Sequence, residues 1–66
     1  MNKMQVFIEP NRHINMRFNG SAASLLKKLR LNQDSVLIVK NGKLVTEKER
    51  LGERDNIKIM RVFSGG

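Results

Sequence analysis

Alternating apolar and polar positions predict two strands near the beginning of the chain. Residues 4–9 are apolar at positions 4, 6 and 8, and residues 14–18 are apolar at positions 14, 16 and 18. A period of two places one set of side chains on one face of a strand. Pro10 and Asn11 lie between the two segments and are typical of a turn. We therefore predict a hairpin with its turn around residues 10–13.

A helix is predicted after this hairpin. Asn19-Gly20 closes the second strand, and Ser21 then stands where an N-cap hydroxyl can accept a hydrogen bond from a free backbone N–H. Four apolar residues follow at the i, i+3, i+4 and i+7 spacing of one helix face, namely Ala22, Leu25, Leu26 and Leu29. Because such a stripe has to be buried, we expect the helix to pack on a sheet.

The next segment contains a strand, a tight turn and a second strand. Residues 36–39 (VLIV) form a continuous apolar run, which is typical of a largely buried strand. Asn41-Gly42 then marks a two-residue turn. Residues 43–45 follow this turn, so we predict that they pair with residues 36–39 as a short strand.

The last part of the chain supplies a loop and a final strand. Residues 46–56 are polar apart from Leu51, which we predict to be an apolar anchor in a loop. Alternation returns from Ile57 to about Val62 and predicts the last strand.

The order of these elements predicts the fold class. With the helix as a crossover, the last strand can lie parallel to the first, in the middle of one compact sheet. We therefore predict an α+β roll, with a mixed sheet of four to five strands and one helix packed across one face.

The composition excludes most kinds of enzyme active site. The chain has 66 residues, so it can form one thin core but no deep substrate pocket besides. It contains no cysteine and one histidine, His13, and it lacks a phosphate-binding glycine loop. We predict no catalytic residue and no metal site. Since no segment approaches the ~20 apolar residues of a membrane span, we expect a cytoplasmic protein that does not enter membranes.

The net charge of +7 leaves more than one class of partner open. Such a charge attracts polyanions or an acidic protein surface, and it also keeps a small protein soluble. A nucleic-acid-binding module would use Lys27, Lys28 and Arg30 for phosphate contacts and Phe7 for base stacking. Three phenylalanines, no tyrosine and no tryptophan give few stacking surfaces, so we favour a protein partner.

The sequence ends on two glycines, Gly65 and Gly66. A Gly-Gly end has no Cβ atoms and reaches backbone angles that other residues avoid, so it can enter a narrow channel in another protein. The four residues 63–66 would extend roughly 13 Å beyond the last strand. On the residues alone, a functional tail and a chance ending remain equally open.

Three segments of the sequence carry a family resemblance. Residues 36–42 (VLIVKNG), 51–59 (LGERDNIKI) and 63–66 (FSGG), in this element order, resemble the β-grasp, ubiquitin-like sulfur carriers of the ThiS/MoaD group. The sequence is also similar to small archaeal ubiquitin-like modifiers and to carriers for tRNA thiolation. The resemblance implies a β-grasp domain over residues 1–62 and a flexible tail over residues 63–66. Arg54 departs from the family, which commonly has glycine at this turn, and the charge of +7 departs from several acidic relatives.

The resemblance implies a carrier rather than an enzyme. An adenylating enzyme of the ubiquitin-activating type would adenylate the carboxylate of Gly66, and a sulfur donor enzyme would convert it to a thiocarboxylate. An acceptor synthase would then use the sulfur in thiamine thiazole, molybdopterin or tRNA thiolation. In the modifier branch, a lysine of a target protein would attack the same carboxyl group. ATP and Mg²⁺ would belong to the activating enzyme, and the carrier, which binds no cofactor, would be a monomer.

The implied tail would enter the partner through Phe63, Ser64, Gly65 and Gly66, and the partner also needs a surface beside this tail. If Ile57 and Ile59 face the helix, Met60 faces the other side of the sheet. We predict that Phe7, Val39 and Met60 form a small exposed apolar patch there, with Lys58 and Arg61 as its charged rim. That these residues instead pack against one another at an end of the sheet remains the alternative.

Overall fold

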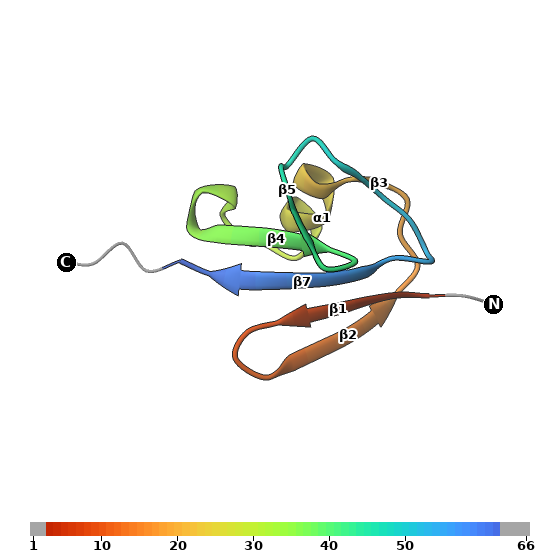
Figure 1. The fold of residues 1–66 in the computed structure, drawn as a ribbon, viewed down its shortest axis with the longest axis horizontal. Coiled ribbons are helices and arrows are strands. Elements are labelled where there is room, and N and C mark those ends of the chain that lie inside the picture. The colour runs from red at the N-terminus through yellow and green to blue at the C-terminus, as the bar shows by residue number, and fades with distance from the viewer. Residues whose placement is uncertain (1–2, 63–66) are drawn as a thin grey trace.

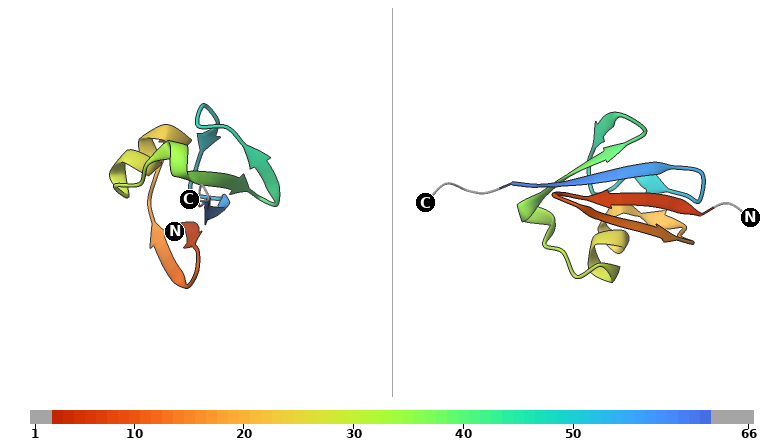
Figure 2. Two further views of the ribbon diagram at one scale, coloured as in Figure 1. Left: turned by 90° about the vertical axis from the view of Figure 1, so that its left-hand side faces the viewer. Right: turned by 90° about the horizontal axis from the view of Figure 1, so that it is seen from below.

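The computed structural model describes residues 3–62, which form a five-stranded sheet with a helix on one face (Figures 1 and 2). The elements are β1 (Met4–Ile8), β2 (Arg12–Met16), β3 (Gly20–Ser21), α1 (Ala22–Lys28), the 3-10 helix η1 (Gln33–Ser35), β4 (Val36–Lys40), β5 (Lys43–Val45), β6 (Arg50–Leu51) and β7 (Asn56–Arg61). The predicted α+β roll with a mixed sheet is confirmed. The predicted tail, residues 63–66, lies outside the described residues.

The last strand lies in the middle of the sheet, as predicted. The strand order is β2-β1-β7-β4-β5, and β7 is parallel to β1 and antiparallel to β4. Because β1 and β7 run in the same direction, Lys3 before β1 and Val62 after β7 lie at opposite ends of the sheet (Figure 1).

The second strand begins and ends two residues earlier than the predicted range of 14–18. The hairpin pairs Met4 with Met16 and Ile8 with Arg12. Since β1 starts at Met4, its ladder ends opposite Met16, and Phe18 falls beyond the paired residues. The side chain of Phe18 still packs, partly buried, against the core. The apolar alternation was therefore a correct indicator of burial but not of strand length.

The helix starts where the sequence predicts it. The hydroxyl of Ser21 accepts a hydrogen bond from the Ser24 backbone N–H at 3.1 Å, which identifies Ser21 as the N-cap. Three members of the predicted stripe, Ala22, Leu25 and Leu26, are buried on the helix. Leu29 is the C-cap residue and is only partly buried, because the helix ends at Lys28.

The turn between β4 and β5 forms at Asn41-Gly42, as predicted, and both residues have positive φ angles, 50° and 86°. Positive φ at both central residues is the geometry that favours Asn-Gly in two-residue hairpins. The interior of β4 differs from the prediction of a largely buried strand. Ile38 is buried, but Leu37 beside it is 43% exposed, because only one face of the strand is covered.

The segment predicted as a loop with an anchor contains a further short strand. Leu51 is 1% exposed, so its predicted role as an anchor is confirmed. It belongs to β6, which pairs with β3 in a separate two-stranded sheet. Both strands have only two residues, which is too short for a period of two to be recognised in the sequence. The 3-10 helix η1 was missed for the same reason.

The core lies between the helix and one face of the sheet. Its fully buried members are Met4, Val6, Ile8, Ala22, Leu25, Leu26, Ile38, Leu51, Ile57 and Ile59. None of the buried residues in the described range is polar or charged. The other face of the sheet carries no helix, and it is therefore the surface on which an interaction site can be built.

Candidate functional site

The open face of the sheet brings together most of the residues predicted to dock a partner. The register places His13, Phe7, Lys58 and Val39 side by side across β2, β1, β7 and β4. Directly paired residues on adjacent strands point to the same face. Ile57 and Ile59, between which Lys58 stands, are buried on the helix side. Phe7, Val39 and Lys58 therefore share the open face.

Met60 lies on this same face, in the next row. Its partner on β4 is Leu37. We use the name apolar patch for Phe7, Leu37, Val39 and Met60. Lys58 lies inside the area of the patch, between Phe7 and Val39, rather than at its rim as predicted.

A shallow hollow of about 340 Å³ lies on the open face, and Phe7, His13, Val39 and Lys58 are among its lining residues. The rings of Phe7 and His13 contact each other, with centroids 4.6 Å apart and an interplanar angle of 46°. This contact partly covers Phe7, and both rings line the hollow. The hollow is a shape into which a small apolar side chain of a partner can fit.

Two exposed leucines of this face were missed in the prediction from sequence. Leu37 is 43% exposed and Leu44, which pairs with Val39, is 66% exposed. The continuous run over residues 36–39 suggested burial on both sides of the strand. Alternation from the buried Ile38 would have placed Leu37 outside, had the sequence shown that one face of the sheet is uncovered.

Arg61 does not belong to the rim of the apolar patch, and the prediction on this residue is wrong. It follows Ile57 and Ile59 with a period of two, so it points to the side of the sheet that carries the helix. There it lines a hollow of about 450 Å³ with Arg30 and Val62, and we name this the arginine hollow; its other lining residues are Leu31, Asn32, Ser35 and Val36.

The last described residue, Val62, lies beside this hollow. Its backbone N–H donates a hydrogen bond of 2.8 Å to the carbonyl oxygen of Ser35, and its side chain is 45% exposed. The four predicted tail residues, Phe63, Ser64, Gly65 and Gly66, follow Val62 in the sequence and lie outside the described residues. The arginine hollow and the Leu37–Met60 row of the apolar patch are therefore the parts of these surfaces nearest to Val62.

The opposite end of the sheet is fixed by Asp55. One carboxylate oxygen accepts a hydrogen bond from the Gly52 backbone N–H at 2.7 Å, and the other accepts from Asn41 Nδ2 at 2.9 Å. Asn41 Oδ1 in turn accepts from the Asn56 backbone N–H at 2.8 Å. Asp55 thus joins the β4–β5 turn to the start of β7. Arg54 beside it has no positive φ, so this turn does not require glycine at that position.

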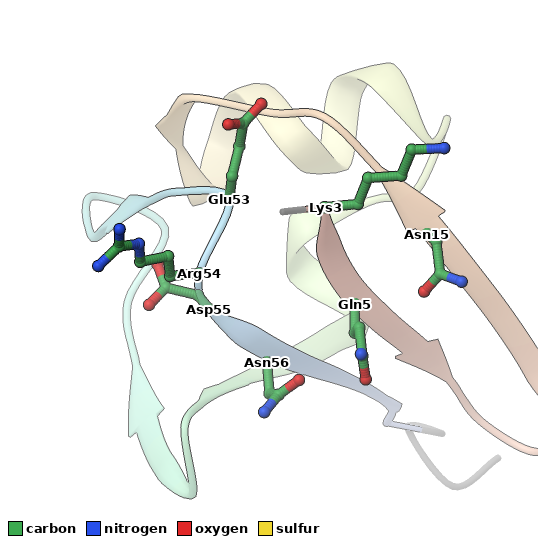
Figure 3. A pocket seen from close by; sticks show the side chains of 7 residues that line it. All are labelled: Lys3, Gln5, Asn15, Glu53, Arg54, Asp55 and Asn56. Atoms are coloured by element: carbon green, nitrogen blue, oxygen red, sulfur yellow. The ribbon is translucent and has the colours of Figure 1, made fainter. Parts of the chain in front are cut away.

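A polar hollow of about 520 Å³ lies at this same end (Figure 3). Gln5, Asn15 and Asn56 reach it from three neighbouring strands, whereas Glu53 and Arg54 point away from one another. Its side chains do not converge on one point, and it lies at the start of β7, at the other end of this strand from Val62. We therefore assign it no role in the site.

Replacing Asp55 by alanine is expected to lower the free energy of unfolding by about 1–2 kcal/mol, because two donors lose a charged acceptor at a partly exposed place. The hydrogen bond from Asn41 and then that from Gly52 lower the pKa of Asp55 below its ordinary value of 3.8. The contribution of the carboxylate to the free energy of unfolding is therefore complete above this value and is lost as the pH falls below it. Urea unfolding of the wild type and of Asp55→Ala, at neutral pH and at about pH 3, measures the difference in their free energies of unfolding at each pH. A difference between the two proteins that does not shrink in acid would contradict the assignment.

The comparison with protein families decides what kind of protein this is. The ThiS family matches the chain over residues 4–66, which includes all the strands, the helix and the diglycine end. The chain belongs to the ThiS family. A comparison with curated proteins gives no significant match.

Membership of the ThiS family gives this chain a general role as a small sulfur carrier. Carriers of this family work with activating enzymes and acceptor synthases. Within residues 3–62, no group of three or more histidine, cysteine, aspartate or glutamate side chains is placed to hold a metal ion. No helix in that part of the chain is long and apolar enough to span a membrane.

Proposed function

We propose that this chain carries sulfur on the carboxyl group of Gly66. The observation that supports the proposal is the family match, which extends through residue 66 and so includes Gly65-Gly66. Two residues without side chains give the narrowest backbone that a chain can present. A carboxylate at the end of such a segment can reach a confined active site that the folded domain itself cannot enter.

The proposed chemistry has two steps, both in the active site of a partner. A carboxylate oxygen of Gly66 attacks the α-phosphorus of ATP, and pyrophosphate leaves. Hydrosulfide then attacks the carbonyl carbon of the resulting acyl adenylate, and AMP leaves with the bonding electron pair. The thiocarboxylic acid that forms loses its proton to solvent, and a thiocarboxylate remains. ATP and Mg²⁺ are supplied in the adenylating enzyme, and a sulfur donor enzyme supplies the sulfide. The thiocarboxylate sulfur is then the nucleophile for an acceptor synthase.

The apolar patch is the proposed docking surface for the adenylating enzyme. A partner that holds the tail has to cover the neighbouring part of the sheet, and β7 leads directly from the patch to Val62. The exposed parts of Leu37, Val39 and Met60 give a continuous apolar area across β4 and β7. Burial of such an area is the usual energetic centre of a protein interface.

Replacing Val39 by glutamate is expected to raise the KM for the carrier in adenylation by about tenfold, because a charge would have to be buried in the docked state. The catalytic constant at saturation should change little. Lys48→Gln is the matched control, since it changes the net charge by the same amount on an exposed loop. Pyrophosphate release at varied carrier concentration measures both constants. Equal KM values for the two variants would show that the patch does not dock the enzyme.

Intact mass spectrometry tests the proposed function itself. The full chain is incubated with the adenylating enzyme of the same organism, ATP, Mg²⁺ and sulfide. We expect an ATP-dependent mass increase equal to the replacement of one oxygen atom by sulfur, located at Gly66. If the tail is instead found joined to lysine side chains of other proteins in the native cell, that result would support a role as a protein modifier. A chain that shows neither change would refute the proposal.

A further inference from the structure

The arginine hollow gathers two cations at the place where the predicted tail begins. Arg30 and Arg61 line it from the end of α1 and from the end of β7, and Val62 lines it as well. Neither arginine forms an ion pair within residues 3–62. The salt bridge in this part of the chain joins Lys40 and Glu49. Asp34, the acidic residue nearest in sequence to Arg30, is not among the lining residues. The hollow therefore presents two guanidinium groups that form no ion pair within residues 3–62.

The end of α1 fixes the position of Arg30. The Leu31 backbone N–H donates a hydrogen bond of 2.8 Å to the Leu26 carbonyl oxygen, and the Arg30 N–H donates one of 3.1 Å to that of Lys27. These bonds close the helix with Arg30 in the left-handed region, at φ 60°. Glycine is the residue that normally occupies this position. Arginine here satisfies no local requirement of the helix end, and what it adds is a guanidinium group at the hollow.

The hollow is also near anything that binds the end of the chain. Val62 forms part of its wall, and under the proposed role of Gly66 the reactive carboxylate lies four residues beyond Val62. Four residues span at most about 13 Å. An enzyme whose active site receives Gly66 thus has to approach Arg30 and Arg61 closely.

We propose that Arg30 and Arg61 bind a carboxylate-bearing segment of the adenylating enzyme, at the entrance of the channel that receives the tail. This inference rests on the proposed role of Gly66. Two guanidinium groups in one hollow can each hold a carboxylate through paired N–H donors, and such contacts set orientation as well as affinity. The net charge of +7 favours an acidic partner and accelerates its association at low salt. The hollow thus defines the chemistry of the partner, whereas the apolar patch supplies contact area.

Charge reversal tests the proposal in the adenylation reaction with the full chain. Arg30→Glu and Arg61→Glu should each raise the KM for the carrier by about tenfold, and the double variant should raise it further, while the catalytic constant at saturation stays close to that of the wild type. The KM of the wild type should rise steeply with salt, and that of the double variant should not. Lys3→Glu is the matched control, because it reverses one exposed charge at the opposite end of the sheet. Its KM should change less than about twofold.

Arg30→Gly separates docking from folding. Glycine suits the left-handed backbone at this position, so the variant should unfold at a temperature no lower than that of the wild type. Its KM for adenylation should nevertheless rise as in Arg30→Glu, though less. If the wild type is adenylated and both charge-reversal variants of the arginines have the same KM as Lys3→Glu, this inference is overturned and the proposed function is left intact. Absence of wild-type adenylation would overturn both.

A nucleotide is the alternative occupant of a cationic hollow. Titration of the carrier alone with ATP, followed by amide NMR shifts, distinguishes it from a protein carboxylate. We expect no saturable shift at Arg30, Leu31 or Arg61. Saturable shifts at these residues, removed by Arg61→Glu, would assign the hollow to a phosphate ligand and overturn the proposal of a protein contact.

Discussion

Removal of Gly65 and Gly66 is expected to abolish ATP-dependent adenylation of the chain while the domain stays folded. The carboxylate would then belong to Ser64 and would lie about 7 Å short of its place in the partner's active site. A displacement of even 1 Å in a reacting group can lower a rate about a hundredfold, so a loss of more than a thousandfold is expected. Pyrophosphate release measures the reaction, and circular dichroism with thermal unfolding measures the fold.

Two further variants make this test specific. Addition of one alanine after Gly66 keeps both glycines but moves the carboxylate, and it should also abolish the reaction. Ser64→Ala keeps the length and the diglycine end, and it should retain most of the activity. Adenylation of the shortened chain at a rate near that of the wild type would refute Gly66 as the reactive residue. It would leave the ThiS family assignment, which covers residues 4–66, unaffected.

Replacement of Leu25 by alanine should have the largest effect on folding. Leu25 is fully buried between α1 and the sheet, in the centre of the core. Leucine-to-alanine changes in such places lower the free energy of unfolding by about 2.7–5 kcal/mol. The transfer free energy of the removed apolar atoms is lost, and a cavity is left in the core. A chain of this length has a total stability of roughly 3–10 kcal/mol. A large fraction of Leu25→Ala molecules should therefore be unfolded near physiological temperature.

Urea unfolding followed by circular dichroism gives the free energies for this prediction. Leu44→Ala is the matched control, since it removes the same atoms from a side chain that is 66% exposed. Its effect should remain below about 0.5 kcal/mol. A small effect of Leu25→Ala together with a large effect of Leu44→Ala would mean that the helix does not cover the sheet as described. That result would also remove the basis for an uncovered open face.

The open face and the arginine hollow have separate roles in the proposed complex. The apolar patch lies on the side of β4 and β7 away from the helix, whereas Arg61 lies on the helix side at the end of β7. A partner that contacts both has to reach around this end of the sheet. Variants of the two surfaces share no contact, so their effects on KM should multiply.

The sequence by itself determined most of the elements and the kind of protein. Period-two and helical patterns identified β1, α1 and β7, and a continuous apolar run identified β4. The Asn-Gly pair identified the turn, and its isolation among polar residues identified Leu51 as a buried anchor. The order of these elements determined the parallel pairing of β1 with β7, because few compact arrangements connect them. The motifs of the second half and the diglycine end carried the resemblance that the family match confirms.

Only the tertiary structure decided which side chains meet on the surface. The pairing of β3 with β6 and the presence of Arg30 and Arg61 around one hollow bring together residues that are distant in the sequence. The exposure of Leu37 depends on which face of the sheet the helix covers. Periodicity reports on which face of its own element a residue lies. Strand register and the packing of the whole domain decide which face is covered and which elements end next to each other. No local pattern in the sequence contains that information.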